Sequence, residues 1–145
     1  NDFIMDIIGY GAEEQNIRLW VNEFGVEQNV NIYIKPDNVQ DIIRNADIYL
    51  STSLFEGTSN SIMEAMNWSL PIVATNVGDN DHLIVEGVNG MLHPIGDYIG
   101  MAHSIATLLS RSEIRNQYGK CGNDTLRSKY SMEVFETRYL ELIKQ

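Results

Sequence analysis

The feature that most constrains the fold is the alternation of short apolar runs with longer segments of helical periodicity. The apolar runs have the length and the β-branched content of strands that are buried on both faces. They cover residues 3–8, 30–34, 48–51, 71–75 and 91–92. Because short connections join strands to helices, the pattern predicts an α/β fold: a Rossmann-like parallel sheet with right-handed crossovers and helices on both faces.

The helical segments become continuous toward the carboxyl end, where they form a helical tail. They cover residues 13–24, a stretch from 37, a stretch from 60, a short turn near 79, and then 97–110, 112–129 and 132–144. The apolar face of the first segment consists of Ile17, Trp20, Val21 and Phe24. Gly25 is placed to end that helix, Asp37 and Gln40 match a capping box, and Ser112 and Ser131 are natural N-caps.

Composition narrows the functions that this chain can have. Its formal net charge of −10 repels phosphate backbones, which argues against nucleic-acid binding. Its apolar runs are all much shorter than the roughly 18 residues of a membrane span. The single cysteine fits a reducing compartment, and the three histidines lack metal-ligand spacing, so we expect no metal site. Without a repeat or a Gly/Pro-rich linker, we expect one α/β unit with its ligand at the carboxyl ends of the strands.

The segment that carries chemistry follows the strand at 48–51. That strand ends in small polar residues, a loop containing Gly57 comes next, and a helix starts directly afterwards, so the N–H groups of residues 59–63 should form an anion site. Glu56 lies just before this helix start and Glu64 lies one turn inside it. We therefore expect two carboxylates on either side of an anion-binding helix end.

A nucleoside diphosphate sugar matches this arrangement. The pyrophosphate suits the N–H groups, while ribose and sugar hydroxyls suit the carboxylates, at about 1.5–3 kcal/mol for each charge-assisted hydrogen bond. Structural alternatives exist for both acids. Ser61 and Glu64 also match a capping box that only closes the helix, and Glu56 alone also fits a solvated loop acid.

Short motifs occur in one order along nearly the whole chain. They are Gly9-Tyr10-Gly11, Asn29-Val30, Ala46-Asp47-Ile48, Glu56-Gly57, Glu64-Ala65-Met66, Leu70 to Thr75, Val77-Gly78 and Gly87 to Gly90. In this order they resemble the donor-binding half of GT-B-fold glycosyltransferases, most closely family four of the retaining enzymes. The pair of glutamates is a weak signal alone and becomes strong in this context.

The resemblance implies a role for each matching residue. Glu56 would contact the donor-sugar hydroxyls as the catalytic-site acid, and Glu64 would hold the ribose. The residues whose amides would take the diphosphate are Gly57, Thr58, Ser59, Asn60 and Ser61. Weaker nucleotide contacts fall on Gly9, Gly11 and Lys35, although a solvated Lys35 is the favoured alternative. The implied reaction retains the anomeric configuration and uses neither a cofactor nor an essential metal.

The resemblance also implies missing parts. In the family, an Arg and a Lys that neutralise the diphosphate precede the Gly-x-Gly strand, and an acceptor-binding half lies further upstream. Asn1 is not a start methionine, and residues 2–8 have no basic flank. We therefore expect residues 1–145 to be a C-terminal donor domain without its first strand unit, inactive alone. Its parent is expected in the cytoplasm, in polysaccharide biosynthesis, with peripheral membrane association left open.

The chain departs from the family pattern at positions that bear on specificity. Asp79 stands where the family usually has a second Gly, and His82 stands where it has a Glu. Thr58-Ser59 replaces an aromatic-Gly pair, and the loop at Lys35 is shorter than usual. These departures leave the identity of the nucleotide base open.

Two alternatives to a transferase remain at this point. One is a nucleotide-sugar epimerase of the same fold, which only residues outside this chain would separate. The other is a non-catalytic, flavodoxin-like binding or regulatory module. A regulatory receiver has no need of Glu56 and Glu64 around a helix start, and it clusters acids at the ends of its first strands, where this chain offers only Asp6.

Overall fold

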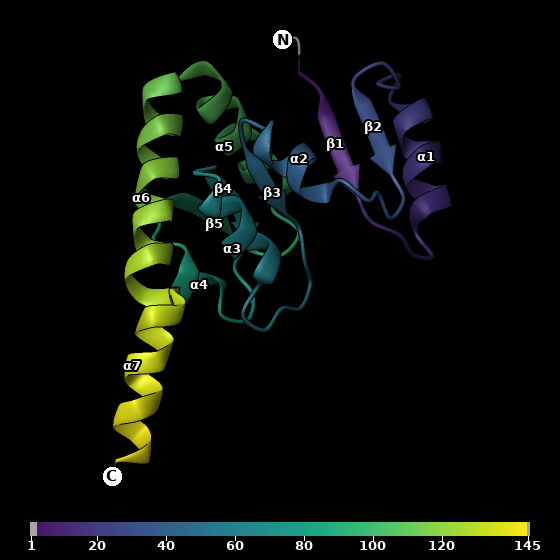
Figure 1. Ribbon diagram of the computed structural model, residues 1–145. Coiled ribbons are helices and arrows are strands. Elements are labelled where there is room, and N and C mark those ends of the chain that lie inside the picture. Colours follow the sequence, from purple (N-terminus) through teal and green to yellow (C-terminus); the bar gives the residue numbers. More distant parts are fainter. Residues whose placement is uncertain (1–2, 145) are drawn as a thin grey trace. The chain divides into compact units, whose positions relative to one another are not determined.

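The computed structural model describes residues 3–144, so Asn1 lies outside the described residues. Figure 1 shows strands and helices in alternation, followed by three consecutive helices. In chain order they are β1 (Met5–Ile8), α1 (Glu14–Glu23), β2 (Val30–Tyr33), α2 (Val39–Arg44), β3 (Tyr49–Ser51), α3 (Asn60–Asn67), β4 (Ile72–Thr75), α4 (Asn80–Leu83), β5 (Gly90–His93), α5 (Tyr98–Ser110), α6 (Ser112–Tyr130) and α7 (Met132–Ile143). Two compact units divide the chain: unit 1 ends at Ile42, and unit 2 begins at Ile43.

Unit 1 contains β1, α1 and β2. The two strands pair in parallel, and Asp6 lies opposite Asn31, whose side-chain amide donates a 2.8 Å hydrogen bond to Asp6 Oδ1. The expectation that these strands are buried on both faces was wrong, because Met5 and Asp6 are exposed and neither strand has a fully buried residue. Polar residues in the middle of both strands interrupt the apolar runs. Helix α1 likewise has no buried residue.

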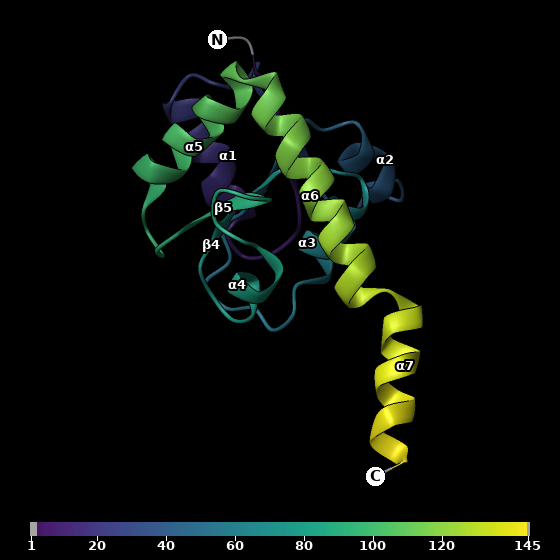
Figure 2. The ribbon, with the colours of Figure 1, turned by 90° about the vertical axis from the view of Figure 1, so that its left-hand side faces the viewer.

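Unit 2 is built on a three-stranded parallel sheet of order β3-β4-β5. All four residues of the central strand β4 are buried, as the apolar run Ile72–Ala74 predicts. Helices α3, α5 and α6 pack against the strands, and α3 also packs against α6. Figure 2 shows α7 continuing beyond the end of α6, away from the sheet. Within residues 3–144, no helix combines the length and apolar character required to cross a membrane.

The predicted α/β class with parallel strands and a helical tail is confirmed, but the prediction of one sheet in one unit is not. Backbone hydrogen bonds join β1 to β2 and join β3 to β4 and β5, which gives two separate ladders. Short connections and apolar runs predict which segments are strands. They do not encode which strands are neighbours, and that depends on the whole set of strands in the sheet.

The core of unit 2 includes a close approach between α6 and the turn after α3. Gly119 of α6 is buried, and a Cβ atom at this position would overlap the backbone carbonyl of Ser69. Ser69 itself adopts a left-handed backbone conformation with φ 57°. On β4, Val73 packs with Met101 and Leu108 of α5. These contacts hold the α3–β4 connection, and therefore the start of the sheet's central strand, in a fixed place.

Helix ends agree with the sequence in part. The Ser131 side chain accepts a hydrogen bond from Val134 N at the start of α7, and Gly25 follows α1 with φ 64°, so both predictions are confirmed. Ser112 is wrong as a cap, because α6 already includes it and Arg111 is the N-cap. The capping box at Asp37 is also wrong. Helix α2 begins two residues later, where the Asn38 carbonyl accepts the first helical hydrogen bonds.

Candidate functional site

The candidate site is the loop between β3 and α3 together with the first turn of α3. Ser51 ends β3 beside Ala74 of β4, and α3 begins at Asn60 with Ser59 as its N-cap. The Ser59 side chain makes no capping hydrogen bond, and the first turn contains no acid. Because Ser61 lies inside the helix, the capping-box alternative for Glu64 is wrong. The positive end of α3 is thus left for a ligand or solvent.

The two acids differ in how they are held. Glu56 is half-buried, and its Oε1 accepts a 2.7 Å hydrogen bond from the Ser53 hydroxyl. Glu64 is also half-buried on α3, and an ionised carboxylate has several acceptor sites. Both carboxylates therefore keep capacity to accept hydrogen bonds. The Ser53 hydroxyl orients the Glu56 side chain, and the choice between a donor-binding acid and a solvated loop acid stays a prediction.

Tyr49 lies within electrostatic reach of both acids, and no sequence pattern identified it as a site residue. Burial is the main cause that raises the pKa of its hydroxyl. A hydrogen bond with the Ser61 side chain opposes this shift, whereas the nearby carboxylates of Glu64 and Glu56 add to it. Ser61 Oγ lies 3.1 Å from Ser59 Oγ, so the hydroxyls extend from the first residue of β3 to the N-cap of α3.

A second loop, between β4 and α4, presses against the candidate loop. Gly78 has φ 55°, and a Cβ atom there would overlap the carbonyl of Glu56, so only glycine fits this approach. Next to it, Asp79 N donates to the Gly57 carbonyl at 3.5 Å, and Thr58 Oγ1 donates to Asp79 Oδ2 at 2.8 Å. Two positions where the chain departs from the resembled pattern, Thr58 and Asp79, are therefore in direct contact.

The other end of the candidate loop is also fixed by β4. The Thr75 hydroxyl donates a 2.6 Å hydrogen bond to the Ser53 carbonyl. The buried Asn80 side chain in turn donates to the Thr75 carbonyl at 2.9 Å and holds α4 against the end of the strand. Between the two tied ends, Phe55 is 90% exposed. Neither Thr75 nor Asn80 was identified from the sequence as a site residue.

The weaker candidates Gly9, Gly11 and Lys35 lie in unit 1. Gly9 N donates to the Tyr33 carbonyl at 3.1 Å, which places the turns after β1 and β2 side by side. The Lys35 ammonium lies 4.1 Å from the centroid of the Tyr10 ring. Lys35 is thus in a cation–π contact within the unit. Its role in nucleotide binding stays a prediction.

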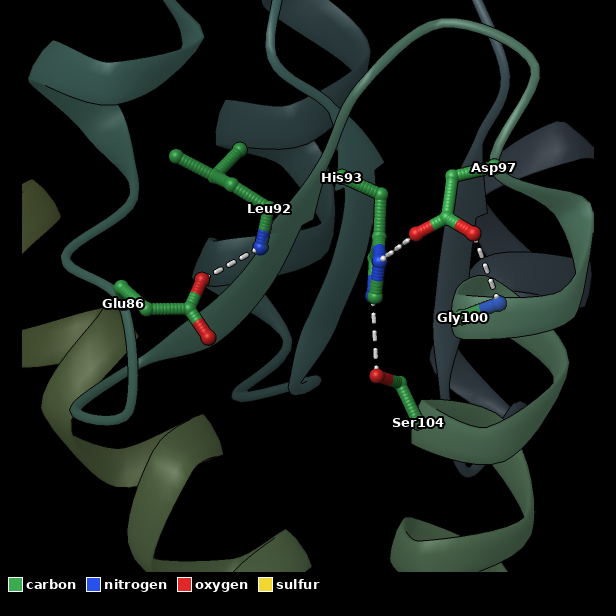
Figure 3. A network of polar contacts seen from close by, with 6 residues as sticks. All are labelled: Glu86, Leu92, His93, Asp97, Gly100 and Ser104. Carbon is green, nitrogen blue, oxygen red and sulfur yellow. Dashed lines mark hydrogen bonds and ion pairs between the residues drawn. The ribbon is translucent and has the colours of Figure 1, made fainter.

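Figure 3 shows a further polar network at the carboxyl end of β5. His93 Nδ1 lies 3.0 Å from Asp97 Oδ2, and His93 Nε2 lies 2.9 Å from Ser104 Oγ. The other Asp97 oxygen accepts from Gly100 N at 3.0 Å, which caps α5. The backbone hydrogen bond from Gly100, followed by the contact with His93, lowers the pKa of Asp97. The network fastens the start of α5 to the sheet.

The geometry suits an anionic ligand that also carries hydroxyl groups. Uncapped N–H groups at the start of α3 attract negative charge, and the two carboxylates with remaining acceptor capacity suit hydroxyl donors. Trp68 and Met66, at the far end of α3, serve structure instead: Met66 is fully buried, and the Arg44 guanidinium lies 5.7 Å from the Trp68 ring. In the described residues 3–144, no group of three or more His, Cys, Asp or Glu side chains is arranged to hold a metal ion.

Comparison with known proteins gives consistent matches. A family model described as "Glycosyl transferases group 1" matches residues 1–125. The lipopolysaccharide core biosynthesis glycosyltransferase LpsE of Rhizobium meliloti is 26% identical over 137 residues, which cover 94% of this chain and 40% of LpsE. The chain therefore spans well under two thirds of this relative.

Solved structures give similar partial matches. A mutant of TarM from S. aureus, in complex with fondaparinux, alpha-GlcNAc-glycerol and UDP, superposes with a TM-score of 0.88 at 26% identity, covering 98% of this chain and 29% of TarM. HepE of Anabaena, in complex with UDP, superposes with a TM-score of 0.90 at 19% identity, covering 98% of this chain and 41% of HepE. The HepE match shows the fold alone.

Proposed function

Because this chain belongs to the glycosyl transferases group 1 family, we propose that it is the donor-binding domain of a retaining glycosyltransferase. In this proposal the whole protein transfers a sugar from a nucleoside diphosphate to an acceptor hydroxyl. The observation that carries the proposal is the uncapped start of α3 with Glu56 and Glu64 on either side, each able to accept further hydrogen bonds. The family match favours transfer over the epimerase and the regulatory module.

Each residue of the site has a defined task in the proposal. Glu64 accepts the ribose hydroxyls, and Glu56, oriented by Ser53, accepts hydroxyls of the donor sugar. Backbone N–H groups from Gly57 to Ser61 hold the diphosphate. Their alignment with the α3 dipole stabilises the charge that develops on the leaving diphosphate, without a metal ion.

Cations for the diphosphate have to come from outside the segment that forms the loop. Residues 45–110 contain no Lys or Arg. The resemblance assigns this task to an Arg and a Lys that precede the first strand here, on a strand unit that we propose lies outside this chain. We propose a cytoplasmic parent protein whose acceptor-binding half is also absent, so residues 1–145 alone have no transfer activity.

The two ladders support a missing first strand. In a doubly wound sheet the strand order is 3-2-1-4-5-6. Taking strand 1 away leaves two ladders, 3-2 and 4-5-6. If β1 to β5 correspond to strands 2 to 6 of that order, the observed ladders β2-β1 and β3-β4-β5 match 3-2 and 4-5-6.

Binding and turnover of the intact protein test the proposal. Calorimetry against UDP, GDP and ADP identifies the base, starting with UDP because both solved structures above are UDP complexes. Glu64→Ala should weaken nucleotide diphosphate binding about ten- to a hundredfold, the effect of losing one charge-assisted hydrogen bond. Glu56→Ala should depress turnover with a smaller effect on affinity for the free diphosphate.

Glu136→Ala on the exposed helix α7 is the matched control and should change neither quantity. Equal and negligible effects of Glu56→Ala and Glu64→Ala would reject the proposed site. Multiple-turnover transfer by residues 1–145 alone would reject the proposal that transfer needs the acceptor-binding half and the further strand unit.

A further inference from the structure

The loop from Thr52 to Ser59, here called the donor loop, is tied to the β4–α4 segment at two points. At its start, the Thr75 hydroxyl donates to the Ser53 carbonyl at 2.6 Å. At its end, the Thr58 hydroxyl donates to Asp79 Oδ2 at 2.8 Å. Between these ties Phe55 is 90% exposed, while the Ser53 hydroxyl holds the Glu56 side chain.

The anchoring side of the second tie is held by packing. Asn80 and Leu83 of α4 are fully buried, and Tyr130 of α6 donates a 3.1 Å hydrogen bond to the His82 carbonyl. Asp79 lies directly before this fixed turn. Its Oδ1 lies 3.7 Å from His82 Nδ1, so its two oxygens face Thr58 and His82. The second tie therefore joins the donor loop to a packed turn.

We propose that Thr58 and Asp79 form a latch that positions the donor loop for ligand binding, and that this pair acts on Glu56 and Gly57 through the backbone. The inference rests on the proposed function of the loop. The latch has a direct route to both residues: Asp79 N contacts the Gly57 carbonyl at 3.5 Å, and Gly78 packs under the Glu56 carbonyl with no room for a side chain.

The latch needs both side chains, because the Thr58 hydroxyl is the donor and the Asp79 carboxylate is the acceptor. A glycine at position 79 would have no side chain to accept the hydrogen bond, and a residue without a short hydroxyl at position 58 would have none to donate. Thr58 and Asp79 therefore act as one coupled pair.

The latch lowers the cost of ordering the loop when a donor binds. Fixing a loop residue from many conformations costs entropy, and a pre-formed hydrogen bond removes part of that cost before binding. Loss of the latch should therefore raise the KM for the donor more than it lowers kcat, because the ground state and the transition state both need the ordered loop.

A double-mutant cycle in the intact protein tests the latch. Thr58→Val removes the hydroxyl at nearly constant volume, and Asp79→Ala removes the acceptor. Each should raise the KM for UDP-glucose, or for the donor whose base calorimetry identifies, about three- to tenfold. The double variant should show no further loss, because both single changes break one interaction. Thr58→Ser and Asp79→Asn, which keep a donor and an acceptor, should recover most of the affinity.

Hydrogen exchange in the unliganded protein supplies a readout that does not depend on the ligand. Amides from Thr52 to Ser59 should exchange faster in Thr58→Val and in Asp79→Ala than in the wild type. The control is Thr107→Val, which removes an exposed hydroxyl that donates to the His103 carbonyl within α5 and should leave the donor loop unchanged.

These outcomes separate the latch from the proposed function. If the wild type binds nucleotide and the variants match it in both KM and exchange, the latch is wrong and the function stands. If both single variants lose affinity and the double variant loses the product of their effects, the residues act independently and the latch is wrong. If the wild type binds no nucleotide, the latch's role in donor binding fails together with the function, whatever the exchange rates show.

Discussion

Units 1 and 2 both contain parallel strands joined by helices, yet they bury their apolar residues to very different degrees. In unit 2 every residue of β4 is buried, together with Ile62, Ala65 and Met66 of α3. In unit 1 neither the strands nor α1 contain a fully buried residue, and Trp20 is 51% exposed. Hydrophobic periodicity therefore specifies which segments form strands and helices, whereas burial depends on the neighbours that complete each layer.

The difference has a direct consequence for stability. Burial of apolar surface is the dominant favourable contribution to folding, at about 25 cal/mol for each Å² removed from water. Unit 2 obtains this contribution from its own residues. Unit 1 obtains little of it, because β1, α1 and β2 contain no buried residue. Three predictions test this contrast.

The largest expected difference is between two isoleucines, Ile72 of β4 and Ile4 before β1. Ile72 is fully buried, whereas Ile4 is 62% exposed. Ile72→Ala should lower the free energy of unfolding by about 2–5 kcal/mol, and Ile4→Ala should change it by less than about 0.5 kcal/mol. Denaturant titrations can follow each unit separately, because Trp20 lies in unit 1 and Trp68 lies in unit 2.

For this purpose Ile72→Ala is measured in a Trp20→Phe background and Ile4→Ala in a Trp68→Phe background. Each is compared with its own background protein. An equal loss from both alanine substitutions would mean that unit 1 has a core of its own and would break the comparison.

A smaller difference is expected between two glycines. In an open helix, Gly→Ala stabilises by about 1 kcal/mol. At Gly119 of α6 the new methyl group would overlap the Ser69 carbonyl, so Gly119→Ala should instead destabilise unit 2 by about 1–3 kcal/mol. Gly9→Ala should be nearly neutral, since nothing lies within 4 Å of the added atom. The same titrations measure both. Stabilisation by Gly119→Ala would show that the approach of α6 to Ser69 is looser than described.

The contrast between the units also marks what the sequence could predict. Short apolar runs and helical periodicity identified the strands and helices. Burial in unit 1 was wrong because a run such as residues 3–8 contains Asp6, and pairing with Asn31 leaves that face polar and exposed. The two ladders were not predictable either, because strand order depends on which strands are present.

The same contrast between local patterns and tertiary contacts applies to the candidate site. Glu56 and Glu64 were identified from local spacing around one helix start. Thr75 and the Thr58–Asp79 contact were not, because they join segments 22 and 21 residues apart. Those contacts depend on the left-handed turn at Gly78, which brings one loop against another. Local patterns therefore locate the residues that would touch a ligand, while the residues that position them require the tertiary structure.

The smallest expected effect concerns polar contacts. The aspartate compared in unit 2 makes more of them than the one in unit 1, just as unit 2 buries more apolar residues. Asp6 in unit 1 accepts one side-chain hydrogen bond, from Asn31. Asp97 in unit 2 accepts a hydrogen bond from Gly100 N and contacts His93, which joins α5 to β5 (Figure 3). Asp97→Ala should therefore lower the unfolding midpoint at pH 7.

The pH dependence of that loss identifies its cause. The pKa of Asp97 is lowered in the folded state, by Gly100 N first and His93 second, below the ordinary value of 3.8. A carboxyl group with a lowered pKa stabilises the fold above its unfolded-state value, and this contribution disappears as the pH falls through the folded-state value. The gap between wild type and Asp97→Ala should thus narrow as the pH falls below 3.8. Ser104→Ala is the control. It removes only the partner of His93 Nε2 and leaves the carboxylate, so its smaller loss of unfolding midpoint should not narrow in acid.

Thermal unfolding monitored by circular dichroism from pH 3 to pH 7 measures the gap between wild type and each variant. An Asp97→Ala gap that is the same at pH 3 and pH 7 would show that the carboxylate charge does not hold α5 to the sheet.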